Sequence, residues 1–104
     1  MIEYMIRRRG GDWFDLHRDD YAAVLRPESF QSRPVSGWGD HRIECGNVEI
    51  SFAYEDPGIQ VSFEGDIANA KARQIVEEIR EKIEAATGQK GYVVDLTGDR
   101  PIRF

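Results

Sequence analysis

The chain has 104 residues, with 14 Lys and Arg against 19 Asp and Glu, so its formal net charge is −5. That length suits one domain built around a single hydrophobic core, and we expect one domain over residues 1–104. The acidic balance argues against nucleic acid and against anionic membrane surfaces as partners, because both are bound through clustered cations.

The cysteine content and the N-terminal stretch bear on the compartment. Cys45 is the single cysteine, so the sequence predicts no intramolecular disulfide and no cysteine-based zinc site. The N-terminal arginines follow the apolar residues, which is the reverse of a secretory signal, and no run approaches the ~20 apolar residues of a membrane span. We therefore expect a cytoplasmic protein with no metal and no cofactor.

The first elements along the chain have weak patterns. Alternating apolar residues predict a strand over 2–6, a turn at 10–12 and a returning strand over 13–17. Residues 21–25 fit either a short helix or a strand. Residues 26–40 contain prolines, serines and glycines with little periodicity, and a loop of that length is usually functional or mobile.

The next elements alternate clearly between apolar and polar residues. This pattern predicts strands over 42–45, 48–54 and 59–64. Gly46-Asn47 is a two-residue hairpin signal, and Pro57-Gly58 predicts a tight reversal between the last two strands. The three strands should therefore form an antiparallel β-meander.

A long amphipathic helix is predicted next, from Ile67 to about Ala86, with Asp66 as its N-cap. Gly88 is the expected C-terminal cap, and a last strand follows over 92–96. The order of elements predicts an α+β fold: a mostly antiparallel sheet with one long helix packed on one face. The apolar stripe of the helix consists of Ala68, Ala72, Ile75, Val76, Ile79, Ile83 and Ala86.

One group of residues could carry chemistry. Asp15, His17 and Asp19 recur at every second position, and on a strand they would share one face. Carboxylates with an imidazole bind divalent metals or move protons, whereas the favoured interpretation is a solvated polar face. His41 is a further candidate for such an enzyme. A nucleophilic pair of His41 with Cys45 is disfavoured, because strand residues four apart are separated by about 13 Å.

The irregular segment carries the best candidate for an interface. Trp38 stands between two glycines, and tryptophan is enriched at the centres of protein interfaces. The alternative, in which Trp38 closes an edge of the core, carries equal weight. We take Trp13, Arg33, Trp38 and Asp40 as the candidate partner-binding residues. No catalytic residue is assigned, because no phosphate-binding loop, zinc-protease or serine-hydrolase motif occurs.

A short stretch also resembles a known class of proteins. Asp56-Pro57-Gly58, followed by Val-Ser-Phe-Glu-Gly-Asp at 61–66, is similar to a stretch found in some small immunity proteins of bacterial toxin–immunity systems. The resemblance implies a toxin-neutralising binding protein without catalysis. It transfers no functional residue to this chain.

The leading hypothesis is therefore a non-catalytic, acidic protein-binding module, an immunity-type inhibitor of a basic toxin domain, since complementary charge speeds association. Residues 46–104 hold 7 basic and 11 acidic groups, so this half is expected to face the partner. The alternative function is a small metal-dependent or acid/base enzyme using Asp15, His17 and Asp19. A homodimer is also open, through exposed edges of the strands in 48–64.

Overall fold

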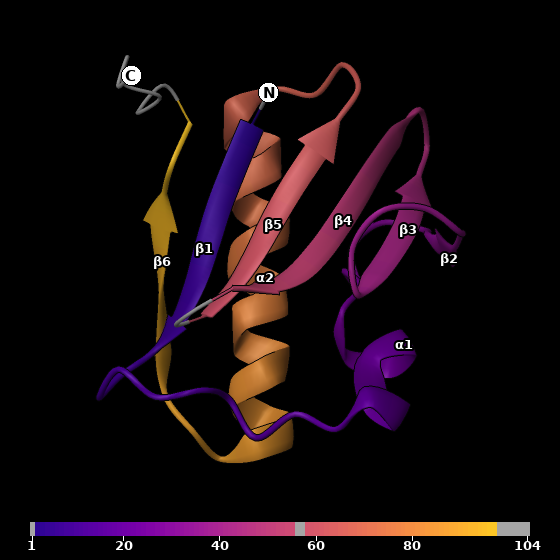
Figure 1. Ribbon diagram of the computed structural model, residues 1–104. Coiled ribbons are helices and arrows are strands. Elements are labelled where there is room, and N and C mark those ends of the chain that lie inside the picture. Colours follow the sequence, from indigo (N-terminus) through magenta and orange to yellow (C-terminus); the bar gives the residue numbers. More distant parts are fainter. Residues whose placement is uncertain (1, 56–57, 98–104) are drawn as a thin grey trace.

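The computed structural model describes residues 2–55 and 58–97. It contains a six-stranded antiparallel sheet in the order β2-β3-β4-β5-β1-β6, with the long helix α2 packed on one face (Figure 1). The expected α+β class is confirmed. The elements are β1 (Ile2–Arg8), a short 3-10 helix η1 (Arg18–Asp20), α1 (Tyr21–Val24), β2 (Arg33–Pro34), β3 (His41–Cys45), β4 (Val48–Glu55), β5 (Gly58–Glu64), α2 (Asn69–Thr87) and β6 (Gly91–Asp95).

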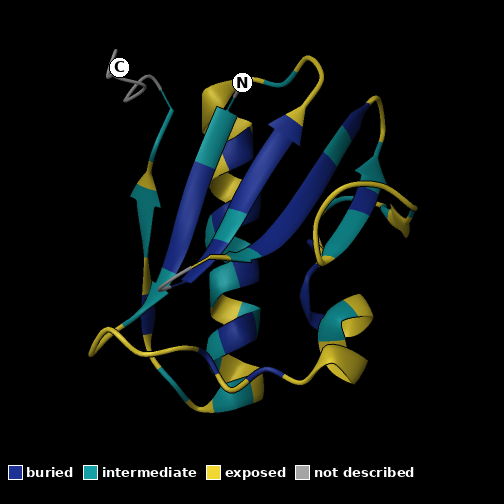
Figure 2. Cartoon of the chain, in the orientation of Figure 1, coloured by how far each residue is buried: buried dark blue, intermediate teal, exposed yellow. Residues whose placement is uncertain are grey.

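The predicted meander forms the middle of the sheet. β3 pairs with β4, and β4 with β5, in the registers His41↔Phe52 and Phe52↔Val61. Alternate side chains of these strands belong to the core cluster that includes α2. Most of β4 and β5 is buried, as their dark colour in Figure 2 shows. The period-2 pattern predicted these strands because one face of each is buried and the other is polar.

The core lies between the sheet and α2. The helix buries one stripe of side chains, as its three- and four-residue spacing predicted. Fully burying an aliphatic or aromatic side chain of this kind contributes about 1.5–3 kcal/mol. The stripe consists of Ala72, Ile75, Val76, Ile79 and Ile83, and its partners on the sheet include Tyr4, Ile6, Ile50, Phe52, Ile59, Val61 and Phe63.

The start of α2 differs from the prediction, and its end agrees with it. The helix begins at Asn69 with Ala68 as N-cap, so the assignment of Asp66 as N-cap was wrong. Residues 65–68 instead carry the chain from the sheet layer to the helix layer. At the other end Gly88 has a φ of +73°, and its N–H donates to the Glu84 carbonyl at 2.8 Å, which confirms the predicted cap.

The strand expected over 13–17 does not form. Phe14 and Leu16 are buried and their neighbours are exposed, so the alternation is present without a ladder of backbone hydrogen bonds. The free side of β1 is paired with β6, in the register Arg7↔Tyr92, which leaves no partner for a returning strand. Residues 21–25 were predicted as either a short helix or a strand, and residues 21–24 form the helix α1.

The prediction that strands in 48–64 form an exposed edge was wrong. β4 and β5 are interior strands, and the two edges of the sheet are β2 and β6. The irregular segment contributes β2, which has only two residues. Gly58 is the first residue of β5, where an added Cβ would lie 2.4 Å from the Ile6 carbonyl oxygen. Asp56 and Pro57 of the predicted turn lie outside the described residues.

Candidate functional site: an aromatic stack with an acidic rim

Three aromatic rings from distant parts of the sequence stack at one end of the sheet. Tyr54, from the end of β4, lies between Trp13, which follows β1, and Tyr21, which begins α1. The Trp13 and Tyr54 ring centroids are 6.0 Å apart with planes at 15°, and those of Tyr21 and Tyr54 are 5.6 Å apart at 20°. We call these three residues the aromatic stack. Trp13 is its outer member and is 41% exposed.

His41 links the aromatic stack to the core. Its ring meets Tyr21 edge-on at 6.1 Å and lies 6.0 Å from the ring of the fully buried Phe52. The Nε2 atom of His41 is buried, and no described residue forms a hydrogen bond with it. Burial lowers the pKa of His41, and burial together with the neighbouring Tyr21 and Asp40 raises the pKa of Tyr54. Both side chains are therefore neutral at physiological pH.

Backbone hydrogen bonds hold the aromatic stack in position. The Tyr54 N–H donates to Asp40 Oδ2 at 2.7 Å, and the Asp40 N–H donates to the Phe52 carbonyl at 2.8 Å. The Trp13 N–H donates to Asp12 Oδ1 at 2.9 Å, while the Trp13 carbonyl accepts from Arg8 Nη1 at 3.0 Å. The indole is thus presented on a fixed backbone, although residues 11–17 form no helix or strand.

Exposed carboxylates surround the aromatic stack in sequence. In residues 12–21, 40–41 and 54–55, which carry the rings, the one arginine or lysine is Arg18. Arg8 reaches Asp12 from outside these segments, at 3.7 Å. The other carboxylates form no ion pair with any described residue. We call these carboxylates the acidic rim: Asp12, Asp15, Asp19, Asp20, Asp40 and Glu55.

Two of the four predicted partner-binding residues come together here. Trp13 and Asp40 both contact Tyr54, one through its ring and the other through its backbone. The net charge of residues 46–104 led us to expect the acidic surface in that half. Most of the acidic rim instead comes from the near-neutral first half. Local grouping of charge, rather than the total for each half, sets the field at a surface.

The other two predicted residues lie elsewhere. Trp38 is 60% exposed, so it does not close an edge of the core. Its loop lies over β3, where a Cβ added at Gly37 would be 2.5 Å from Arg42 Cδ. Arg33, in β2, forms an ion pair with Glu44 at 2.6 Å. Their part in binding remains a prediction.

The arrangement expected for the alternative enzyme is absent. Asp15 lies in irregular structure, His17 precedes η1 and Asp19 lies within it, so the three do not share the face of a strand. The Asp15 N–H donates to the Gln89 side chain at 2.8 Å. Within residues 2–55 and 58–97, no three His, Cys, Asp or Glu side chains gather closely enough to hold a metal ion.

The sequence alone did not single out Tyr21 and Tyr54. Tyr54 ends the strand predicted over 48–54, and in the structure it is partly buried near the end of β4. A usable signal was the group of four aspartates around Trp13 and Tyr21: Asp12, Asp15, Asp19 and Asp20.

Comparison with known proteins adds no relative. No family model matches the chain, and no significantly similar curated protein or solved structure was found. Neither α1 nor α2 has the length and apolar character needed to cross a membrane, and the described residues contain no other α-helix.

Proposed function

We propose that the chain is a non-catalytic protein-binding module that neutralises a basic toxin domain, as immunity proteins do. The observation that carries the proposal is the aromatic stack: an exposed indole, fixed on a well-held backbone and flanked in sequence by exposed carboxylates. The partner's contact residues would be arginines or lysines.

The exposed ring of Trp13 supports this choice of partner. A guanidinium or ammonium group over an indole face is stabilised by about 0.5–2 kcal/mol. Because Tyr54 and the backbone of Trp13 already fix the ring, binding orders few additional side-chain rotamers. Tryptophan and arginine are also the residue types that most often dominate interface energies.

The acidic rim supports a basic partner through long-range attraction. Complementary charge raises association rates and lowers them again when salt is added. A basic toxin domain acts through its positive surface, for example on nucleic acid, and an acidic protein covering that surface would block access. Inhibition of this kind requires no catalytic group.

Growth protection with a defined partner tests the proposal. The product of the reading frame next to this gene is expressed from an inducible promoter, with and without this chain, and growth is recorded. We expect the neighbour to be toxic alone and harmless when this chain is present. The two purified proteins should bind, and their association rate should fall steeply with ionic strength.

Two variants provide the control. Trp13→Ala should weaken protection, and replacing Asp19 and Asp20 together by Asn should slow association while leaving most of the affinity at high salt. A harmless neighbour that does not bind this chain, or binding that is indifferent to salt and to both variants, contradicts the proposal.

A further inference from the structure

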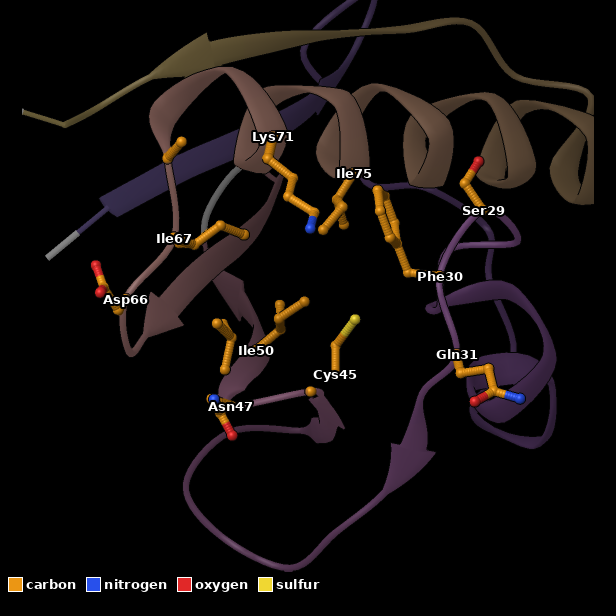
Figure 3. A pocket seen from close by; sticks show the side chains of 13 residues that line it. Ser29, Phe30, Gln31, Cys45, Asn47, Ile50, Asp66, Ile67, Lys71 and Ile75 are labelled. Carbon is orange, nitrogen blue, oxygen red and sulfur yellow. The ribbon is translucent and has the colours of Figure 1, made fainter.

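A second feature, separate from the aromatic stack, is a hollow beside the start of α2. It has a volume of about 660 Å³ and is bounded by the first turns of α2, the β3–β4 turn and residues 29–31. Figure 3 shows the Lys71 ammonium and the Cys45 sulfur both directed into it. We call it the helix-start pocket and define it by Phe30, Cys45, Val48, Ile50, Lys71 and Ile75.

The walls of the helix-start pocket are part apolar and part polar. Ile50 and Ile75 are almost fully buried behind the hollow, and the apolar surface that reaches it belongs to partly buried side chains packed against the core, Phe30, Cys45 and Ile67. A pocket of several hundred Å³ that combines apolar surface with a few placed polar groups is the usual form of a small-molecule site.

Lys71 supplies the positive charge, and Ser29, Gln31 and Asn47 supply other polar side chains of the lining. Its Nζ lies 4.8 Å from the centroid of the Phe30 ring, and among the described residues it forms no ion pair. Asp66 also borders the hollow, at its far rim in Figure 3. A cation held against an aromatic wall, with no carboxylate in contact, has the charge to bind an anion.

The start of α2, where Lys71 lies, has no negative charge and no side-chain cap to balance its positive end. Its N-cap is Ala68, which offers no side-chain acceptor, and its first turn contains no acidic residue. A lysine in the first turn of a helix opposes the positive end of the helix dipole, which favours anions. The start of α2 therefore carries an electrostatic cost that an anion in the pocket would relieve.

We propose that the helix-start pocket binds a small monocarboxylate with an apolar body. The carboxylate pairs with Lys71, and the aliphatic or aromatic part lies against Phe30, Cys45 and Ile67. A bare phosphate would leave these apolar surfaces unused, and an alkylammonium would face a like charge. Cys45 lies in the wall, where burial raises the pKa of its thiol and keeps it neutral.

The test uses octanoate and benzoate as probes, with octylammonium and inorganic phosphate as controls. Binding is measured by calorimetry and by the rate at which a neutral reagent, iodoacetamide, alkylates Cys45. We expect at least one carboxylate to bind saturably and to slow alkylation, while both controls have little effect. Lys71→Gln should weaken carboxylate binding about tenfold or more, because it removes a charge-assisted contact.

Lys90→Gln is the matched control variant, since Lys90 lies beyond the opposite end of α2 and does not border the pocket. It should bind as the wild type does. The proposal is overturned if neither carboxylate binds at millimolar concentration, if octylammonium protects Cys45 as well as octanoate, or if Lys71→Gln and Lys90→Gln bind equally.

Discussion

The central phenylalanines of the sheet and the two tryptophans of the chain differ sharply in exposure. Phe52 and Phe63, in the regular half, are buried beneath α2, whereas Trp13 and Trp38, in the irregular first half, are exposed. The strands and helix hold the fold through side chains that water does not reach. The segment over 9–40 presents Trp13 and Trp38 outward, while its Phe14 is buried. The contrast separates residues that determine stability from residues that are free to bind.

The irregular segment is nevertheless attached to the core. It buries Phe14, Leu16, Val24 and Leu25, and it is therefore held in place while its intervening side chains remain exposed. A surface of this kind can be rigid without regular secondary structure, since a few buried side chains and backbone hydrogen bonds fix its course.

The largest expected effect on stability lies in the regular half. Phe52 is fully buried beneath α2, so Phe52→Ala should lower the free energy of unfolding by about 3–5 kcal/mol through lost burial and a residual cavity. Trp38→Ala, on the exposed loop, should change it by about 0.5 kcal/mol or less. Chemical denaturation measures both, and equal effects would contradict the division described above.

Gly58→Ala should have the next largest effect on the free energy of unfolding. Its Cβ would lie 2.4 Å from the Ile6 carbonyl oxygen, so β1 and β5 must move apart, at a cost of about 1–3 kcal/mol. Gly46→Ala is the comparison, because its Cβ meets nothing within 4 Å and only its φ of +65° opposes the change. If Gly46→Ala were the more harmful, backbone conformation rather than close strand approach would control these positions.

Asp40→Ala tests the hydrogen bond that connects the irregular segment to β4. It removes the acceptor of the Tyr54 N–H and should cost about 1–2 kcal/mol in the free energy of unfolding. Asp40→Asn keeps a side-chain oxygen and should cost less. The Trp13 fluorescence of the folded Ala variant, in a Trp38→Phe background, should report a change at the aromatic stack. An unchanged spectrum and unchanged stability would show that Asp40 does not position Tyr54.

A smaller effect is expected from pH. Because burial lowers the pKa of His41, the unfolded chain binds its proton at a higher pH than the folded chain does. The contribution of His41 to the free energy of unfolding should be constant well above pH 6.5 and should decrease as the pH falls through and below it. Denaturation at a series of pH values measures the slope, and His41→Gln should reduce it.

The carboxylate of Glu84 affects stability over a lower range of pH than His41 does. The Gly91 N–H, 2.8 Å from Glu84 Oε2, and then the Arg80 guanidinium lower the pKa of Glu84. The stability that Glu84 contributes is present above about pH 4.5 and is lost as the pH falls further. A His41→Gln variant whose stability still fell between pH 6.5 and 4.5 as the wild type's does would exclude the assignment to His41.

The regular half was predictable because its patterns are local. Alternation over 48–54 and the stripe of α2 each report one buried face, and Gly88 meets a local conformational need. The first residue of α2 could not be predicted from local sequence, because it depends on how the chain crosses from the sheet layer to the helix layer. The same is true of the position of β1, which enters the sheet between β5 and β6 through pairings far apart in sequence.

The candidate site was predictable only in part. Trp13 and Asp40 were identified by residue type, but their meeting at Tyr54 depends on β3, β4 and the segment after β1 arriving at one end of the sheet. The rings of the aromatic stack come from residues 13, 21 and 54, and no periodicity links such positions. Lys71 lies outside the predicted apolar stripe of the helix, and nothing local shows that it borders a pocket.

The central claim is that the Trp13 surface binds the partner without holding the fold. Affinity for the neutralised partner and the free energy of unfolding, measured on the same Trp13→Ala protein, test it most directly. We expect the affinity to fall about thirtyfold, as for a central interface tryptophan, while the unfolding free energy changes by about 1 kcal/mol. An unchanged affinity, or a loss of folding in place of a loss of binding, would contradict the claim.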